Sequence, residues 1–475
     1  MFKLSAILLV GAVIALGKTV TKADSIFLKT FQNLHKDPAP PAQTRASVQI
    51  LSIKQQLDHF DQNETRTWSM RYMANDEFFE EGGPMFIYVG GEWAISPGSI
   101  SGGHVYDMAK EHHGYLFYTE HRYYGESHPL PDLTTDNLKY LDVKQALADL
   151  AHFIRTMRQE IPGMENSKAI LTGGSYSATM VTWFKKLYPD LVAGSWASSA
   201  PLFAKVDFME YKEVMGDSIH LAYGEECNTR IRNGIAELET MFEEKRVAEV
   251  RAMLRLCNHF DETNDLDVWT LFGEISDTFA GVVQTHNDGD IQRACKTIMD
   301  GPDDLTGLTN YLLKNWNEPG SCNDLTYNSA LNELKETAYN GAMRPWLYQT
   351  CNEFGWYQTS SSKKQPFGTK FPLPYYTTLC ADAYSPTFTN KFIHQQIEKT
   401  NEFFDGLELK VDNVYMTHGQ LDPWRAMGLQ EGNQTTIIPM HAHCKDLGSI
   451  TENDTPEMRA SKEKISQLVK QWLAE

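Results

Sequence analysis

The sequence predicts an α/β fold in which a mostly parallel sheet, covered by helices, is interrupted by a long helical insert. Strand-like and helical patterns alternate from about residue 47 to 205, and a strand pattern returns at about 386, which favours parallel strands joined by helices. The segment 206–385 is charged and helical, and it contains six of the seven cysteines. At 475 residues the chain is too long for one small core, so we expect a core in two parts, 47–205 and 386–475, and an inserted cap domain, 206–385.

Residues 1–23 have the pattern of a secretory signal peptide. Lys3 precedes a thirteen-residue apolar run from Leu4 to Leu16, and this order is typical of such signals. The run is shorter than the roughly 20 residues needed to cross a bilayer, which favours cleavage over an uncleaved signal anchor. We expect no membrane span in the mature chain, which begins with a polar, proline-rich lead-in as far as about residue 45.

The first core segment contains a strand followed by glycines. The apolar run Met85–Val89 ends at Gly90-Gly91-Glu92. If the fold is that of an α/β-hydrolase, an N–H of the loop after such a strand helps to bind the oxyanion of the reaction. Gly91 is our candidate donor, and an ordinary turn is the alternative. A helix is predicted over Leu141 to Met157, because apolar residues recur there at helical spacing.

A tight turn between a strand and a helix holds the most informative serine. The strand-like run Lys168–Leu171 leads to Gly173-Gly174-Ser175, and a helical pattern follows at once. This order is that of the nucleophile elbow of α/β-hydrolases, in which small neighbours allow a strained serine. Ser177 takes the place of the last glycine of the G-x-S-x-G pattern. The alternative is a glycine-bearing turn with an idle serine.

An aspartate and a histidine follow Ser175 in the order that α/β-hydrolases require. A nucleophilic serine needs a base, and the base needs a group that fixes its tautomer. Asp422 lies in the loop after the apolar run Asn413–Met416, and His443 lies in the loop after the strand-like Thr435–Ile438. Functional groups of open α/β sheets gather at the carboxyl ends of strands, so we expect the three side chains to converge.

His441 is a second histidine in the same loop, and its spacing from His443 raises the alternative of a metal site. No cysteine or carboxylate cluster at zinc-like spacing accompanies the pair. We therefore expect neither a metal nor a cofactor.

Six short stretches form a recognisable set. They are Gly90-Gly91-Glu92, Glu120-His121-Arg122-Tyr123-Tyr124-Gly125-Glu126-Ser127, Gly173-Gly174-Ser175-Tyr176, Ala197-Ser198-Ser199-Ala200-Pro201, Gly419-Gln420-Leu421-Asp422-Pro423-Trp424 and His443-Cys444. Together they resemble the serine peptidase family that includes lysosomal Pro-X carboxypeptidase, dipeptidyl-peptidase II and thymus-specific serine protease. The last of these branches is the nearest in pattern.

The resemblance implies a role for each matching residue. It makes Ser175 the nucleophile, Asp422 the group that orients the base, and His443, rather than its neighbour two residues earlier, the base. It assigns an oxyanion-binding N–H to Tyr176. It also implies that Trp424 packs on the proline ring of the substrate, and that a helical cap covers the cleft and favours short peptides.

The chain departs from the family pattern at three positions. His418 stands where an asparagine is usual, Trp93 where a glycine is common, and Ala178 where a second glycine is frequent. None of these changes removes a member of the proposed triad. Trp93 adds bulk beside the oxyanion loop, and the shape of the substrate subsites is therefore open.

The cysteines become interpretable once secretion is predicted, because secreted chains form disulfides. Sequence reasoning alone leaves the pairing within the insert open. The resemblance implies the pairs Cys351–Cys380, Cys227–Cys295 and Cys257–Cys322. We expect Cys444, beside His443, to be a buried free thiol. The sequons at Asn63, Asn433 and Asn453 are candidate glycosylation sites.

The leading hypothesis is a secreted or lysosomal serine exopeptidase that cleaves short peptides next to proline through an acyl-enzyme on Ser175. Its direction, carboxypeptidase or dipeptidyl-peptidase, is open; Glu92 is a candidate ligand for a terminal ammonium, although a structural role is favoured. A carboxylesterase or lipase on the same fold and a catalytically silent hydrolase-like binding protein are the alternatives. The formal net charge of −19 argues against nucleic acid and anionic membranes as partners, and a homodimer is left open.

Overall fold

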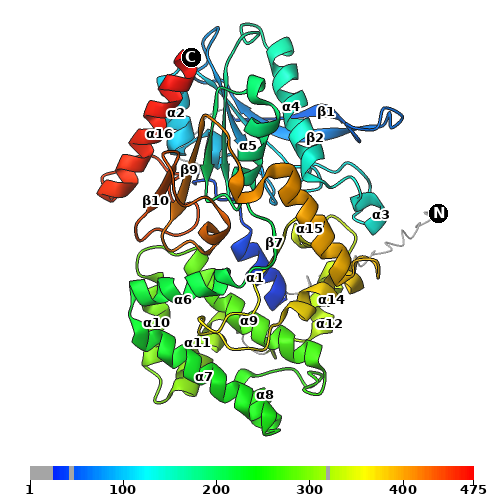
Figure 1. Cartoon of the computed structure of the whole chain (residues 1–475), viewed down its shortest axis with the longest axis vertical. Helices are drawn as coiled ribbons and strands as arrows, with labels where there is room; N and C mark the ends of the chain where they lie inside the picture. Colours follow the sequence, from blue (N-terminus) through cyan, green and yellow to red (C-terminus); the bar gives the residue numbers. More distant parts are fainter. Residues whose placement is uncertain (1–24, 42–47, 317–320) are drawn as a thin grey trace, which may run out of the picture.

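The computed structural model describes residues 25–41, 48–316 and 321–475. The predicted signal peptide lies outside the described residues. Figure 1 shows a twisted sheet with flanking helices in the upper half of the molecule and a group of helices below it. None of the described helices is both long and apolar enough to span a bilayer.

Eight strands form the main sheet, in the order β1-β2-β4-β3-β5-β6-β9-β10. The strands of the chain are β1 (Gln49–Gln56), β2 (Thr67–Asn75), β3 (Met85–Val89), β4 (Tyr115–Thr119), β5 (Ala169–Gly174), β6 (Gly194–Ser198), β7 (Lys205–Asp207), β8 (Gly355–Tyr357), β9 (Val414–Gly419) and β10 (Thr435–Ile438). β2 pairs antiparallel with β1 and β4, whereas the pairs from β4 to β10 are parallel. This is the mostly parallel sheet that the sequence predicts.

The helices cover both faces of the sheet and extend below it. They are α1 (Ile26–Leu34), α2 (Gly103–Glu111), α3 (Thr135–Leu138), α4 (Val143–Glu160), α5 (Tyr176–Leu187), α6 (Glu210–Ala222), α7 (Glu225–Glu243), α8 (Val247–Leu254), α9 (Asp265–Gln284), α10 (Asp290–Met299), α11 (Asp304–Trp316), α12 (Tyr327–Lys335), α13 (Met343–Gln349), α14 (Leu373–Ala383), α15 (Asn390–Phe404) and α16 (Pro456–Ala474).

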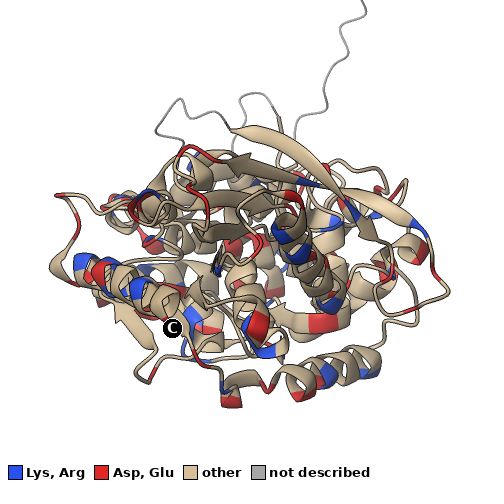
Figure 2. Cartoon of the chain, turned by 90° about the horizontal axis from the view of Figure 1, so that it is seen from above, with Lys and Arg blue, Asp and Glu red and all other residues tan. Residues whose placement is uncertain are grey.

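The central strands are apolar on both faces because helices cover both. All residues of β3 and β5 are buried, as expected for parallel strands between two helical layers. Ile87 and Leu171 belong to the core cluster that includes the apolar residues of α4 and α5. Phe86 and Ile170, on the opposite face, pack in a second cluster with residues of α2 and α16. In Figure 2 the positions of charged residues are mainly on the outer helices and loops, with few on the central strands.

The helices from α6 to α14 lie at one end of the sheet (Figure 1), and this stretch of the chain contains the three disulfides. The bonds join Cys227 to Cys295, Cys257 to Cys322 and Cys351 to Cys380, which are the pairs that the resemblance implies. Because each bond closes a loop within this helical region, it restricts the unfolded chain there most strongly.

Two strands extend further than the pattern of apolar residues indicates. β9 continues through His418 to Gly419, where the sequence predicts a loop, and β6 includes Ser198, where it predicts a turn. Both strands are buried between neighbours along their length, so ladder bonds to adjacent strands outweigh the weak strand preference of glycine and serine.

Candidate active site

Ser175 occupies a strained turn between β5 and α5. Its backbone has φ 59° and ψ −132°, a conformation that is unusual for any residue other than glycine. A Cβ on Gly173 would lie 2.4 Å from the carbonyl oxygen of Ser177, so no larger residue fits there. The strain and the close packing are those of a nucleophile elbow, which directs the serine hydroxyl away from the sheet.

Ser177 explains how the turn closes without the last glycine of the pattern. It is completely buried, and its Oγ accepts a hydrogen bond from Gly174 N and donates one to Gly174 O, both at 2.9 Å. The serine side chain therefore ties the first turn of α5 back to the strand.

Asp422 and His443 form the predicted pair. The Nδ1 atom of His443 lies 2.9 Å from each carboxylate oxygen of Asp422, and Asp422 Oδ1 also accepts from Trp424 N at 3.0 Å. Burial by itself would raise the pKa of Asp422 and lower that of His443, but their mutual attraction outweighs it. The pKa of Asp422 is therefore lowered, and the pKa of His443 is raised well above its ordinary value.

The end of β6 brings the serine and the histidine loop together. The carbonyl oxygen of Ser198 accepts from Ser175 N at 2.9 Å and from the thiol of Cys444 at 3.6 Å. Ser199 Oγ accepts from Cys444 N at 3.0 Å. Cys444 is buried and unbonded to another cysteine. One strand end thus anchors both the turn of Ser175 and the residue that follows His443.

The second nitrogen of the imidazole is free to act. His443 Nε2 is buried and has no hydrogen-bond partner among the described residues, so its bond to the Ser175 hydroxyl is not formed in this structure. Such bonds are often long without substrate and tighten in the reacting complex. In the neutral form of the imidazole, Nδ1 donates to Asp422 and Nε2 carries the lone pair that a general base needs.

Tyr176 and Gly91 are the predicted oxyanion donors. Neither N–H donates a hydrogen bond to another described residue. The Trp93 ring lies against Gly91, where a Cβ would be 2.5 Å from the indole, and the Trp93 indole N–H donates to Tyr118 OH at 2.8 Å. Trp93 therefore fixes this loop, and its bulk is accommodated by the glycine.

The phenol of Tyr176 is held by a buried histidine. His121 Nδ1 donates to the carbonyl of Arg122 at 2.7 Å, so Nε2 accepts from Tyr176 OH at 3.1 Å. Burial lowers the pKa of His121 to about 4, which keeps it neutral and preserves this arrangement. The same hydroxyl accepts from Gln349 Nε2 at 3.0 Å.

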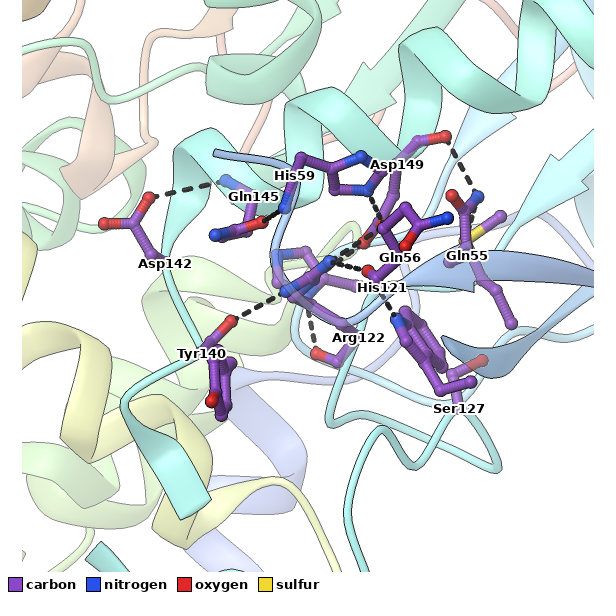
Figure 3. Close-up of polar contacts among 12 residues, drawn as sticks. Gln55, Gln56, His59, His121, Arg122, Ser127, Tyr140, Asp142, Gln145 and Asp149 are labelled. Atoms are coloured by element: carbon purple, nitrogen blue, oxygen red, sulfur yellow. Dashed lines mark hydrogen bonds and ion pairs between the residues drawn. The ribbon is translucent and has the colours of Figure 1, made fainter. Parts of the chain in front are cut away.

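Arg122 anchors the loop that carries His121 (Figure 3). Its fully buried guanidinium makes two bonds to Asp149 of α4, at 2.7 and 2.8 Å, and His59 Nε2 lies 2.7 Å from the same carboxylate. Burial by itself would raise the pKa of Asp149, but these two partners lower it. In the sequence analysis, residues 120–127 contribute only to the family resemblance, and the Arg122–Asp149 ion pair was not predicted.

Aromatic rings form a continuous wall between the histidine and Tyr176. Trp424 lies 6.4 Å from the His443 ring and 5.5 Å from Trp356, which stacks on Phe354 at 4.7 Å. Phe354 lies 5.3 Å from Tyr176. Trp356 and Phe354 were missed by the sequence reasoning, because they come from the predicted insert and only the fold brings them here.

Gln284, the last residue of α9, joins the helical region to the catalytic loops. Its carbonyl accepts from His443 N at 3.2 Å, and its side-chain oxygen accepts from the indole of Trp424 at 2.9 Å. The amide nitrogen of Gln284 donates to the carbonyl of Leu34 at 2.7 Å. A single residue therefore contacts the base, an aromatic wall residue and the N-terminal segment.

Glu92 and His418 are two buried ionisable groups near the site. Glu92 pairs with His35 Nδ1 at 3.1 Å, and its other oxygen is buried without a partner among the described residues. Burial lowers the pKa of His418 to about 4, and neither ring nitrogen has a hydrogen-bond partner there. His418 is therefore neutral at physiological pH and supplies no charge to Asp422.

The three sequon asparagines, Asn63, Asn433 and Asn453, are exposed. No group of three His, Cys, Asp or Glu side chains in the described ranges could hold a metal ion. His441 Nδ1 lies 2.7 Å from the carbonyl of Pro439 and is separate from the Asp422 pair.

Comparison with known proteins matches the chain to one peptidase family over most of its length. Residues 55–465 match the family model described as serine carboxypeptidase S28. Mouse thymus-specific serine protease (Mus musculus) is 29% identical over 451 residues, covering 89% of this chain and 87% of that protein. The human protein of the same name (Homo sapiens) is 28% identical, with 89% and 86% covered. Bovine lysosomal Pro-X carboxypeptidase (Bos taurus) is 27% identical, with 90% and 88% covered.

Proposed function

Since the chain belongs to the serine carboxypeptidase S28 family and is a serine-type peptidase, we propose that it removes residues from the end of short peptides beside proline through an acyl-enzyme on Ser175. The observation that carries the proposal is the Asp422–His443 pair, whose Nε2 is buried without a partner among the described residues. The strained turn of Ser175 and the residue after His443 are both bonded to the carbonyl of Ser198.

The proposed reaction follows from the roles of these groups. His443 Nε2 takes the proton of Ser175 Oγ as the hydroxyl attacks the scissile carbonyl carbon, while the charge on Asp422 stabilises the imidazolium. The N–H groups of Tyr176 and Gly91 bind the oxyanion. His443 then protonates the leaving amine, and a water molecule activated by the same imidazole hydrolyses the acyl-enzyme.

We propose that the aromatic wall binds the proline ring. The name of the bovine relative states that it is a Pro-X carboxypeptidase. The Trp424 ring lies 6.4 Å from the His443 ring and 5.5 Å from the Trp356 ring. The indole N–H of Trp424 is bonded to Gln284, so the ring is fixed before substrate arrives. A rigid aromatic surface suits the flat, apolar pyrrolidine ring.

The carboxypeptidase direction is the better supported. Lys445 lines the same cavity as His443. Its ammonium donates to the neutral side chain of Asn287 at 2.8 Å, and a cation there would bind a terminal carboxylate. Glu92, the candidate ligand for a terminal ammonium, is already paired with His35. The proposed core, 47–205 and 386–475, and cap, 206–385, would enclose this cleft, and the disulfides of the cap suit an extracellular or lysosomal compartment.

Matched short peptides test the direction and the chemistry together. We expect hydrolysis of an N-blocked peptide that ends in Pro-Phe, and little hydrolysis of the same peptide with a C-terminal amide. Cleavage of only the free-amine peptides would favour a dipeptidyl-peptidase. Hydrolysis of short esters without any peptide cleavage would favour the esterase alternative. Ser175→Ala must abolish every activity that is assigned to this site.

A further inference from the structure

The segment Ser25–Pro41 lies between the sheet and the helical region, next to the catalytic residues. α1 packs against α9, and in Figure 1 it lies at the centre of the molecule, between the strands and the lower helices. Ser25 caps the helix by accepting from Leu28 N at 3.2 Å. The segment is therefore a folded element at the junction of the two regions.

The proline-rich end of the segment reaches the nucleophile turn. Pro38 Cγ lies 2.9 Å from the position that a Cβ on Gly174 would take, and Cys444 Sγ lies 3.2 Å from the same point. Pro38 also lines the cavity of about 390 Å³ that His443 lines. A substrate approaching Ser175 from this cavity would meet the proline.

Polar contacts hold the segment in place along its length. Asp37 accepts from Tyr118 OH at 2.9 Å and from Ser96 Oγ at 2.7 Å. Since Tyr118 OH also accepts from the Trp93 indole, Asp37 is linked to the oxyanion loop. His35 pairs with Glu92, which is buried directly after Gly91 of that loop.

The helix of the segment fills the aromatic end of the cleft. Phe31 stacks on His35 at 4.3 Å, and His35 lies 5.2 Å from Trp346. Thr30 donates to the buried carboxyl of Glu274. Residues of α1 line a further cavity of about 950 Å³ together with Trp346 and Trp356, so the segment covers apolar and carboxylate groups that could otherwise contact a peptide.

We propose that Ser25–Pro41 is an inhibitory prosegment, which occupies part of the substrate cleft and lowers the activity of the enzyme until it is displaced. The proposal rests on the proposed function only in taking this cleft as the one that binds peptides. The segment follows the predicted signal peptide directly, so it would be present as soon as the chain is secreted. Removal of Ser25–Pro41 would leave the contact between Asp422 and His443 in place.

Variants that weaken the contacts of the segment test the proposal in the full chain. His35→Ala/Asp37→Ala removes the contact of His35 with Glu92 and the hydrogen bonds of Asp37 with Tyr118 and Ser96. We expect at least about a tenfold rise in the rate at which a small fluorophosphonate labels Ser175 and in kcat/KM for an N-blocked prolyl peptide. Gln32→Ala, on the exposed side of α1, should leave both rates unchanged. A synthetic peptide of residues 25–41 should raise the KM of the double variant without changing its kcat.

A second measurement uses the wild-type chain and does not depend on the folding of a variant. Brief trypsin treatment should cut after the exposed Lys29 or Lys36, and activity should rise as mass spectrometry shows the cut. Lys29→Gln/Lys36→Gln should resist this activation. Labelling at equal rates in the wild type, the folded double variant and the cut chain would overturn the prosegment proposal. No labelling in any form would instead contradict the catalytic role of Ser175.

Discussion

Replacing Asp422 with asparagine should leave the site folded and remove the tautomer that catalysis requires. Asp422 Oδ1 accepts from Trp424 N at 3.0 Å, and both carboxylate oxygens lie 2.9 Å from His443 Nδ1. An asparagine would keep its oxygen toward the Trp424 N–H and turn its NH₂ toward His443. Nδ1 must then accept a hydrogen bond, so the proton moves to Nε2, which can no longer take the proton of Ser175.

The magnitude follows from this change of tautomer. In a serine protease of another fold, the equivalent change reduces kcat about 10⁴-fold, and the same logic applies here because the aspartate is buried and makes the same Nδ1 contact. A 10⁴-fold loss corresponds to about 5 kcal/mol of transition-state stabilisation. The substitution is isosteric, so we expect the affinity for substrate, and therefore KM, to change little.

The loss of kcat is measured by steady-state hydrolysis of an N-blocked prolyl peptide. Asp422→Asn is introduced into the His35→Ala/Asp37→Ala variant, in which the segment Ser25–Pro41 is displaced. Asp412→Asn, at an exposed position, is the matched control and should retain full activity. Thermal unfolding of both variants checks that they are folded. A folded Asp422→Asn enzyme that loses less than about tenfold in kcat would refute the proposed role of the aspartate.

Three further predictions concern stability. Arg122→Met should lower the free energy of unfolding, measured in urea, by about 3–5 kcal/mol, because it leaves Asp149 buried without its main partner. The double variant Arg122→Met/Asp149→Leu should lose less stability, because no unpaired carboxylate remains. Equal losses in the two variants would contradict the ion-pair explanation. Burial raises the pKa of Glu274 from 4.5 to about 8, so the folded state retains a proton that the unfolded state releases, and stability should fall as pH rises from about 4.5 to 8. Glu274→Gln should lose part of this slope, and identical slopes by urea unfolding would exclude the raised pKa. Cys351→Ala/Cys380→Ala opens a loop of 29 residues and should cost about 3–4 kcal/mol, and an unchanged unfolding midpoint would rule this out.

The sequence predicts the parts of the site that depend on local order along the chain. The elbow can be predicted because the glycines, the serine and the small residues after it are consecutive in the chain, between a strand-like run and a helical pattern. Asp422 and His443 can be proposed from the sequence because each follows a strand in the chain order of α/β-hydrolases. In the structure, His443 Nδ1 lies 2.9 Å from Asp422 Oδ1. The strand limits were less accurate, since β9 runs on to Gly419 through ladder bonds that no local pattern contains.

The contacts that cross between distant segments could not be predicted in the same way. The lead-in before residue 45 reads as a polar, proline-rich tail, yet Ile26–Leu34 is a helix that contacts α9. Its partner lies more than two hundred residues away in the chain: Thr30 and Glu274 are separated by 244 positions. The bond between Ser198 and the thiol of Cys444 is similar, because nothing in either local sequence identifies the other.

The position of Gln284 limits how the two halves of this enzyme can move. Its main-chain carbonyl accepts from the N–H of His443 and its side-chain oxygen accepts from the indole of Trp424, so a hinge motion that moved α9 away from the sheet would also displace these two residues. We therefore expect the enzyme to favour substrates that enter without moving α9, such as the narrow free end of a short peptide.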